Sequence, residues 1–138
     1  MKLNEKVMDF LKNNKVWNIA TYGEDGAHVV PCFHTAVLDG ETLVVSAVFL
    51  RTTLKNIAEN GSVAVSVFAP TPTGMFEGYQ VMGKATYTEE GEAYEVGKAL
   101  VGQKPLPYRG ALVIKVENGT VTSPGPNVGK SFDNVQWL

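Results

Sequence analysis

The apolar positions of this chain repeat with two periods, one helical and one typical of strands. Residues recur at helical spacing in three segments, which predicts helices over Asn4–Asn14, Arg51–Asn60 and Glu89–Gly102. Thr52 or Thr53 is the expected N-cap of the second helix, because a threonine hydroxyl can accept a hydrogen bond from a free N–H of the first turn. Helices are therefore a minor part of the predicted fold.

Between the helices the apolar residues alternate with period two, which predicts strands. The expected strands are Val16–Tyr22, Ala27–Leu38, Thr42–Val48, Ser62–Ala69, Met75–Thr88, Gly110–Glu117 and Thr120–Ser123. Pro31 interrupts the second of them, which suits an edge strand or a bulge. The dipeptides Asp39-Gly40 and Asn118-Gly119 predict tight hairpin turns. Antiparallel strands joined this way close most naturally into a β-barrel, so we expect one mainly β domain over residues 1–138.

Composition and charge exclude several classes of function. Hydrophobic residues make up 44% of the chain and charged residues 19%, as in a globular domain with one core. A formal net charge of −2 argues against an OB-like nucleic-acid binder, which needs a basic surface. No apolar run approaches the roughly 18–20 residues that span a bilayer, and the N-terminus shows no signal-peptide pattern. With Cys32 as the single cysteine, these features predict a cytoplasmic protein without disulfides.

The start of the second predicted helix combines the groups that bind an anion. Arg51, Thr52, Thr53 and Lys55 lie within five residues of one another. A guanidinium presents a planar fork to phosphate oxygens, and a helix N-terminus adds free N–H groups and a positive dipole end. The alternative is that Thr53 only caps the helix and Arg51 is solvated.

Four stretches of the sequence together resemble a known family. They are Asn18–Gly26 leading into His28–Pro31, Arg51–Ile57, Gly78–Ala85 and Gly110–Val116. In order and spacing they are similar to the pyridoxamine 5′-phosphate oxidase-like FMN-binding split barrels, in particular the small FMN-binding proteins. The resemblance covers nearly the whole chain. It implies a split antiparallel β-barrel and a homodimer with two FMN molecules at the interface.

The resemblance also implies roles for particular residues. Arg51, Thr52, Thr53 and Lys55 would bind the FMN phosphate. Three residues of the second strand, Pro31, Cys32 and Phe33, would lie along the flavin ring or ribityl chain, largely through backbone groups. The alternative is that Phe33 belongs to the core and Pro31 only marks an edge.

Three further candidates come from the loop before Gly110 and from the tail. Tyr108 would reach across the dimer and stack on the ring. The tail over residues 124–138 would pack at the dimer interface, where Lys130 would approach the flavin or a substrate anion and Trp137 would be buried. A tail over residues 124–138 that packs on its own barrel is the alternative.

Metal and thiol chemistry find little support. His28 and His34 fall on one face of the predicted strand, but six residues place them roughly 20 Å apart, too far to share a metal ion. Cys32 has no third group to orient a base beside it, so we expect a buried, inert thiol.

The leading hypothesis is an FMN-dependent oxidoreductase or electron-transfer flavoprotein, in which the cofactor performs the redox chemistry. Oxidation of pyridoxamine 5′-phosphate itself is not expected, because the C-terminal Arg and His substrate motif of those enzymes has no counterpart here. The alternative is a non-enzymatic carrier that binds a flavin, haem or deazaflavin on the same barrel. The electron donor and the substrate are not indicated.

Overall fold

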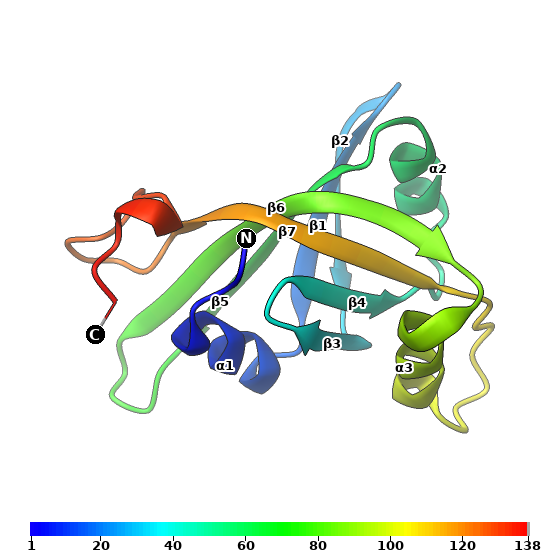
Figure 1. Ribbon diagram of the computed structural model, residues 1–138, viewed down its shortest axis with the longest axis horizontal. Coiled ribbons are helices and arrows are strands. Elements are labelled where there is room, and N and C mark those ends of the chain that lie inside the picture. The colour runs from blue at the N-terminus through cyan, green and yellow to red at the C-terminus, as the bar shows by residue number, and fades with distance from the viewer. Residues whose placement is uncertain (138) are drawn as a thin grey trace.

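Seven strands form one antiparallel sheet, which a computed structural model describes over residues 1–137 (Figure 1). The strands are β1 (Trp17–Gly23), β2 (Gly26–Cys32), β3 (Thr35–Asp39), β4 (Thr42–Ser46), β5 (Ser62–Pro70), β6 (Phe76–Thr88) and β7 (Ala111–Val121). The helices are α1 (Glu5–Asn13), α2 (Arg51–Glu59), α3 (Gly91–Val101) and the short 3-10 helix η1 (Phe132–Asn134). The order across the sheet is β2-β1-β5-β6-β7-β4-β3. The three predicted helices are confirmed to within one or two residues at each end.

The sheet curls until its two edges meet, and this makes it a barrel. β2 and β3 are the edge strands, yet only Phe33 and His34 separate them in the chain. The link is fixed on both sides, because Ser46 N donates to the His34 carbonyl at 2.9 Å and Thr35 Oγ1 donates to the Lys15 carbonyl at 2.6 Å. We call this place, where β2 and β3 approach without pairing, the seam. The predicted split antiparallel barrel is thus confirmed.

The prediction of one continuous strand over Ala27–Leu38 is wrong. Residues 33–34 turn the chain from one sheet edge to the other, so His28 lies on β2 and His34 in the link. Pro31 does lie on an edge strand, opposite Asn18 of β1. Its missing N–H therefore removes no hydrogen bond from the interior of the sheet.

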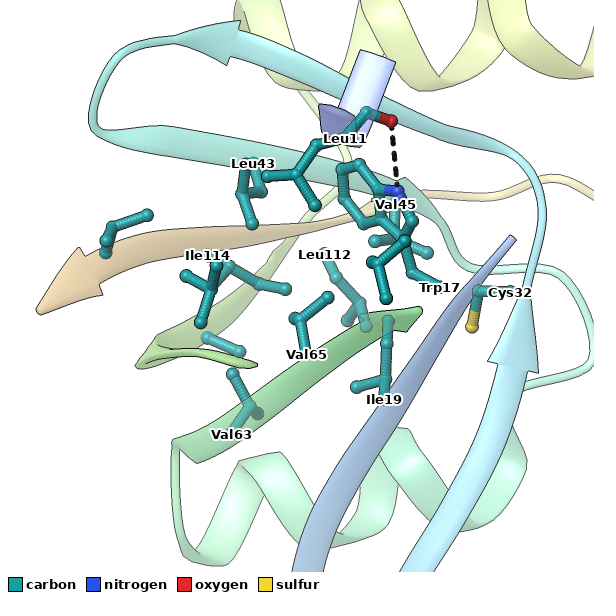
Figure 2. Packing of buried hydrophobic residues seen from close by; sticks show 14 of the residues in the cluster. Leu11, Trp17, Ile19, Cys32, Leu43, Val45, Val63, Val65, Leu112 and Ile114 are labelled. Atoms are coloured by element: carbon teal, nitrogen blue, oxygen red, sulfur yellow. Dashed lines mark hydrogen bonds between the residues drawn. The ribbon is translucent and has the colours of Figure 1, made fainter. Parts of the chain in front are cut away.

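The barrel interior is a single apolar core (Figure 2). Its fully buried members include Leu11, Trp17, Ile19, Leu43, Val65, Leu112 and Ile114. α1 contributes Leu11 to this core. The end of α1 also supplies acceptors for the indole N–H of Trp17: Nε1 donates to the Leu11 carbonyl at 3.3 Å and to the Asn14 carbonyl at 2.9 Å. A buried indole whose N–H is paired avoids the desolvation penalty.

β4 is buried along its whole length because it is covered on both faces. Leu43 and Val45 point into the barrel core, whereas Val44 belongs to a second small cluster with Ala93 of α3 and Ala111. This double burial explains why the strand reads as a continuous apolar run rather than as an alternating one. α3 therefore lies outside the barrel, against β3, β4 and β7.

The last predicted hairpin is absent, and β7 continues as one strand from Ala111 to Val121. It pairs with the long strand β6, and the register shifts between Met82 and Gly83, where β7 carries an extra residue in a bulge. Gly119 does not turn the chain; it lies directly against the Phe132 ring, where a side chain would collide. Pairing with thirteen-residue β6 overrides the local turn signal of Asn118-Gly119.

The tail folds back along the end of β7. Val121 N donates to the Lys130 carbonyl, and Gly129 N donates to the Val121 carbonyl. Phe132 is buried, and the half-buried Trp137 packs on Phe132 and on Tyr79 of β6. The tail thus packs on its own barrel.

Over residues 1–137, no helix has the length and apolar character that a bilayer crossing requires. In the same range, no three His, Cys, Asp or Glu side chains gather in a way that would hold a metal ion.

Candidate functional site

A largely apolar cavity of about 260 Å³ opens at the seam, and we call it the seam cavity. It is lined by Val30, Pro31, Cys32, Phe33, His34, Ser46, Val48, Phe49, Leu50 and Leu106. Three of these, Pro31, Cys32 and Phe33, are the residues expected beside a flavin ring. The structure places them next to the chain segment that leads directly into Arg51.

The N-terminus of α2 lies at the end of that segment and is not capped by a side chain. Leu50 is the N-cap residue and makes no side-chain hydrogen bond, so the prediction of Thr52 or Thr53 as cap is wrong. The first hydrogen bond inside the helix runs from Leu54 N to the Leu50 carbonyl. The N–H groups of the first turn therefore point out of the helix without a side-chain acceptor, next to the exposed side chains of Arg51 and Thr52.

Thr53 differs from its neighbours because its side chain is fully buried. Its Oγ1 has no hydrogen-bond partner among the described residues. An unpaired buried hydroxyl typically costs about 1–3 kcal/mol. The first turn of α2 thus has unused hydrogen-bonding capacity both at its surface and beneath it.

Phe49 adds backbone strain and exposed aromatic surface to the same place. Its φ of 58° lies in the left-handed region, which bulky residues rarely adopt. The Phe49 side chain is 78% exposed, and Phe33 on the other wall of the seam cavity is 62% exposed. Strained residues and exposed rings around an apolar cavity are typical of a binding site.

The seam cavity also contains a histidine that the sequence did not indicate as a site residue. His34 is buried, and its Nε2 lies 3.1 Å from Nζ of Lys104, which comes from the loop between α3 and β7. Burial, together with the charge of Lys104, lowers the pKa of His34 below its ordinary 6.5. Pairing of residues 70 positions apart leaves no local sequence signal.

Cys32 and Ser46 are the other polar groups of the cavity wall. Burial raises the pKa of the Cys32 thiol to about 11, so it is protonated at neutral pH. Ser46 Oγ donates to the Gly97 carbonyl at 2.7 Å and is satisfied. A protonated, buried thiol is a poor nucleophile, as expected from the sequence.

Two predicted site residues lie away from the seam cavity within the chain. The Tyr108 hydroxyl donates to the Tyr94 carbonyl at 2.7 Å, and its ring packs on Tyr94 of α3. Leu106, from the same loop, lines the cavity instead. Lys130 lies in the tail, where its carbonyl accepts from Val121 N at the far end of β7 from Ala111, and it does not line the seam cavity.

Lys55 is exposed on α2, one turn after Arg51. It follows the first turn, so it lies farther along the helix from the free N–H groups than Arg51 and Thr52 do.

A larger hollow of about 500 Å³ lies on the other flank of α2, against β6. Leu54, Ile57 and Ala85 form part of its wall, and Arg109 at its rim is 3.7 Å from Glu89. None of the site residues predicted from the sequence lines this hollow. Because the Glu89 carboxylate lies beside Arg109, this hollow is a weaker anion site than the N-terminus of α2.

Comparisons with known proteins agree with this fold. The family model for pyridoxamine 5′-phosphate oxidase matches residues 3–123. An uncharacterized protein of Methanocaldococcus jannaschii is 38% identical over 94% of this chain and 87% of its own length. An FMN-binding protein of Nitratidesulfovibrio vulgaris is 32% identical over 63% of this chain and 75% of its own.

A solved structure extends the likeness to the whole barrel. The crystal structure of an FMN-binding protein from Syntrophomonas wolfei superposes with a TM-score of 0.76 and covers 88% of this chain and 87% of its own. At 16% identity this shows a shared fold. The family match, by contrast, spans most of the sequence, and the chain belongs to the pyridoxamine 5′-phosphate oxidase family of split-barrel proteins.

Proposed function

We propose that this protein is an FMN-binding flavoprotein that holds the cofactor at the seam, between two copies of the chain. The observation that carries the proposal is the junction of two features. An uncapped α2 N-terminus with exposed Arg51 and Thr52 directly follows the wall of an apolar cavity. A phosphate attached to a planar, largely apolar ring system matches both parts.

The phosphate end is supported by the groups of the first turn of α2. Arg51 supplies a forked cation, Thr52 a hydroxyl, and the free N–H groups complete an anion site. Thr53 lies beneath them with an unpaired hydroxyl. A ligand oxygen that reaches this hydroxyl after a side-chain rotation would recover the lost hydrogen bond.

The ring end is supported by the apolar walls of the seam cavity, and its size favours a second copy of the chain. Cofactor and drug-sized ligands usually occupy pockets of about 300–1,000 Å³, so one protomer provides only part of such a site. Phe33 and Phe49 of the cavity wall are each more than 60% exposed, as is Val29 farther back on β2. Covering these side chains with a partner subunit would complete the pocket and bury apolar surface.

When bound, FMN would supply two-electron redox chemistry. The residues of this chain would anchor the phosphate, exclude water from the ring and set the local charge. No described carboxylate lines the seam cavity, and Cys32 is protonated, so we propose an oxidoreductase or electron-transfer role without a covalent step on the protein.

The phosphate assignment is tested by comparing FMN with riboflavin, which lacks the phosphate. Arg51→Ala should weaken FMN binding roughly ten- to a hundredfold, because a charge-assisted contact contributes about 1.5–3 kcal/mol. Riboflavin affinity should not change. Lys98→Ala, which removes an exposed cation on α3, is the matched control and should bind both ligands as the wild type does. Equal weakening of FMN and riboflavin in Arg51→Ala would contradict the phosphate site.

The redox role needs a separate measurement on the FMN-loaded protein. Anaerobic mixing with NADH or NADPH, followed by flavin absorbance, should show reduction if either nucleotide is the electron donor. Reduction by dithionite but by neither nucleotide would favour an electron-transfer partner over direct nicotinamide chemistry. Analytical ultracentrifugation of the same sample should show a dimer, and a monomer with full FMN occupancy would contradict the shared site.

A further inference from the structure

Lys104 is an exposed residue whose ammonium group contacts one lining residue of the seam cavity, His34. Its Nζ lies 3.1 Å from Nε2 of His34, a residue that is 6% exposed and lines the cavity. An ammonium group can only donate hydrogen bonds, so Nε2 must be the unprotonated nitrogen of a neutral ring. The imidazole therefore orients the ammonium group without neutralising its charge.

No carboxylate compensates this charge. Among the described residues, the one ion pair joins Arg109 to Glu89, and the seam cavity has no acidic residue in its lining. The Cys32 thiol in the same wall is protonated. Lys104 is exposed in the single chain, where water screens its charge, and a partner subunit that covers the seam would remove this water and strengthen the interaction of the ammonium group with charge in the cavity.

We propose that Lys104, positioned by His34, makes the seam cavity favour a bound ring that carries negative charge over the same ring without charge. The proposal rests on FMN binding at the seam. An oxidised flavin ring is neutral, and a ring that takes up two electrons and one proton gains one negative charge. Lys104 would thus raise the two-electron midpoint potential of the bound cofactor, while His34 acts as a positioning residue.

The direct test is the midpoint potential of bound FMN, measured at equilibrium with a reduced dye of known potential as electron source. Lys104→Gln should lower this potential by at least about 30 mV, which corresponds to a tenfold weaker preference for the reduced form. Affinity for oxidised FMN should change little. Lys98→Gln, on α3, is the charge-matched control and should keep the wild-type potential.

Two further variants test the positioning role of His34. His34→Ala removes the acceptor and should lower the potential in the same direction as Lys104→Gln. His34→Gln retains an acceptor oxygen and should restore part of the difference. Since a buried histidine can be needed for folding, the contact is also tested without FMN: in Lys104→Gln the NMR-titrated pKa of His34 should rise toward its ordinary value.

The outcomes separate this inference from the function on which it rests. Full FMN binding with the same potential in wild type and Lys104→Gln would overturn the role of Lys104 and leave the FMN site intact. An unchanged His34 pKa in Lys104→Gln would show that the two side chains do not interact, and would also overturn it. Failure of the wild type to bind FMN would contradict the proposed function, and the inference with it.

Discussion

The closed side of the barrel and its seam are both formed by β-strands, but they differ in strand pairing and in backbone strain. On the closed side, formed by β5 and β6, the two strands pair from Ser62 to Pro70 without interruption, and Val63, Val65 and Val81 belong to the apolar core. At the seam, β2 and β3 approach without pairing. Phe49 is strained, the Thr53 hydroxyl is unpaired and the buried His34 faces a cation. The strained Phe49 and the contact between His34 and Lys104 thus lie where we place the cofactor. An unpaired buried hydroxyl occurs in both regions, because Thr122 Oγ1, beside β6, also has no partner among the described residues.

The largest difference in unfolding free energy between the two regions should appear when an aromatic side chain is replaced by alanine. Trp17→Ala empties a fully buried site and leaves two carbonyls without their donor, so it should cost about 3–5 kcal/mol of unfolding free energy. Phe33→Ala at the seam should change the stability of the FMN-free protein by less than about 0.5 kcal/mol. Urea unfolding of both variants measures the contrast. Comparable losses would mean that Phe33 is already packed in the free protein.

Two threonines, each with a buried hydroxyl, sharpen the comparison. Thr21 Oγ1 accepts from Asn56 Nδ2 at 3.0 Å, so Thr21→Val should leave that amide unpaired and cost about 1–3 kcal/mol. Thr53→Val keeps the shape of the side chain but removes a hydroxyl that has no partner. It should therefore cost nothing without FMN and stabilise by up to about 1 kcal/mol. A clear loss of stability in Thr53→Val would show that this hydroxyl is satisfied in solution.

The smallest expected effect is the contribution of His34 to the pH dependence of the unfolding free energy. Because its pKa is lowered in the folded state, unfolding takes up protons at low pH, and His34 stabilises the fold only in its neutral form. Its contribution should be complete above pH 6.5 and should be lost as the pH falls below that value. Thermal unfolding between pH 8 and pH 5 should show this slope in the wild type and a flatter one in His34→Gln. Asp39, whose pKa is lowered mainly by a hydrogen bond from the Glu41 backbone, contributes its slope only below pH 3.8.

Much of the barrel could be predicted from the sequence, because strands and tight turns are indicated by residues that are neighbours in the chain. Alternation marks the strands, and Asp39-Gly40 marks a real turn between β3 and β4. The Asn118-Gly119 signal failed because long pairing with β6 outweighs a local turn preference. The break at Phe33–His34 was missed for a related reason: a switch between sheet edges depends on how the whole sheet curls.

The candidate site was predictable only where its residues are adjacent in sequence. The sequence indicates both the run from Arg51 to Thr53 and the run from Pro31 to Phe33. In the structure the second run lines the seam cavity, and the first directly follows Leu50 of the cavity wall. The contributions of Lys104 and Leu106 were not found, because their loop reaches the seam only after α3 has packed outside the barrel. Tyr108, which the family resemblance indicates in that loop, is hydrogen-bonded to α3 instead.

The position of the cofactor is tested most directly by a titration of the isotope-labelled protein with FMN, followed by amide NMR. We expect the chemical-shift changes to concentrate at residues 30–34, 46–53 and 104–106, while amides in the paired core of β5 and β6 keep the chemical shifts of the free protein. Shifts centred on the hollow between α2 and β6, or no change in the spectrum at saturating FMN, would contradict it.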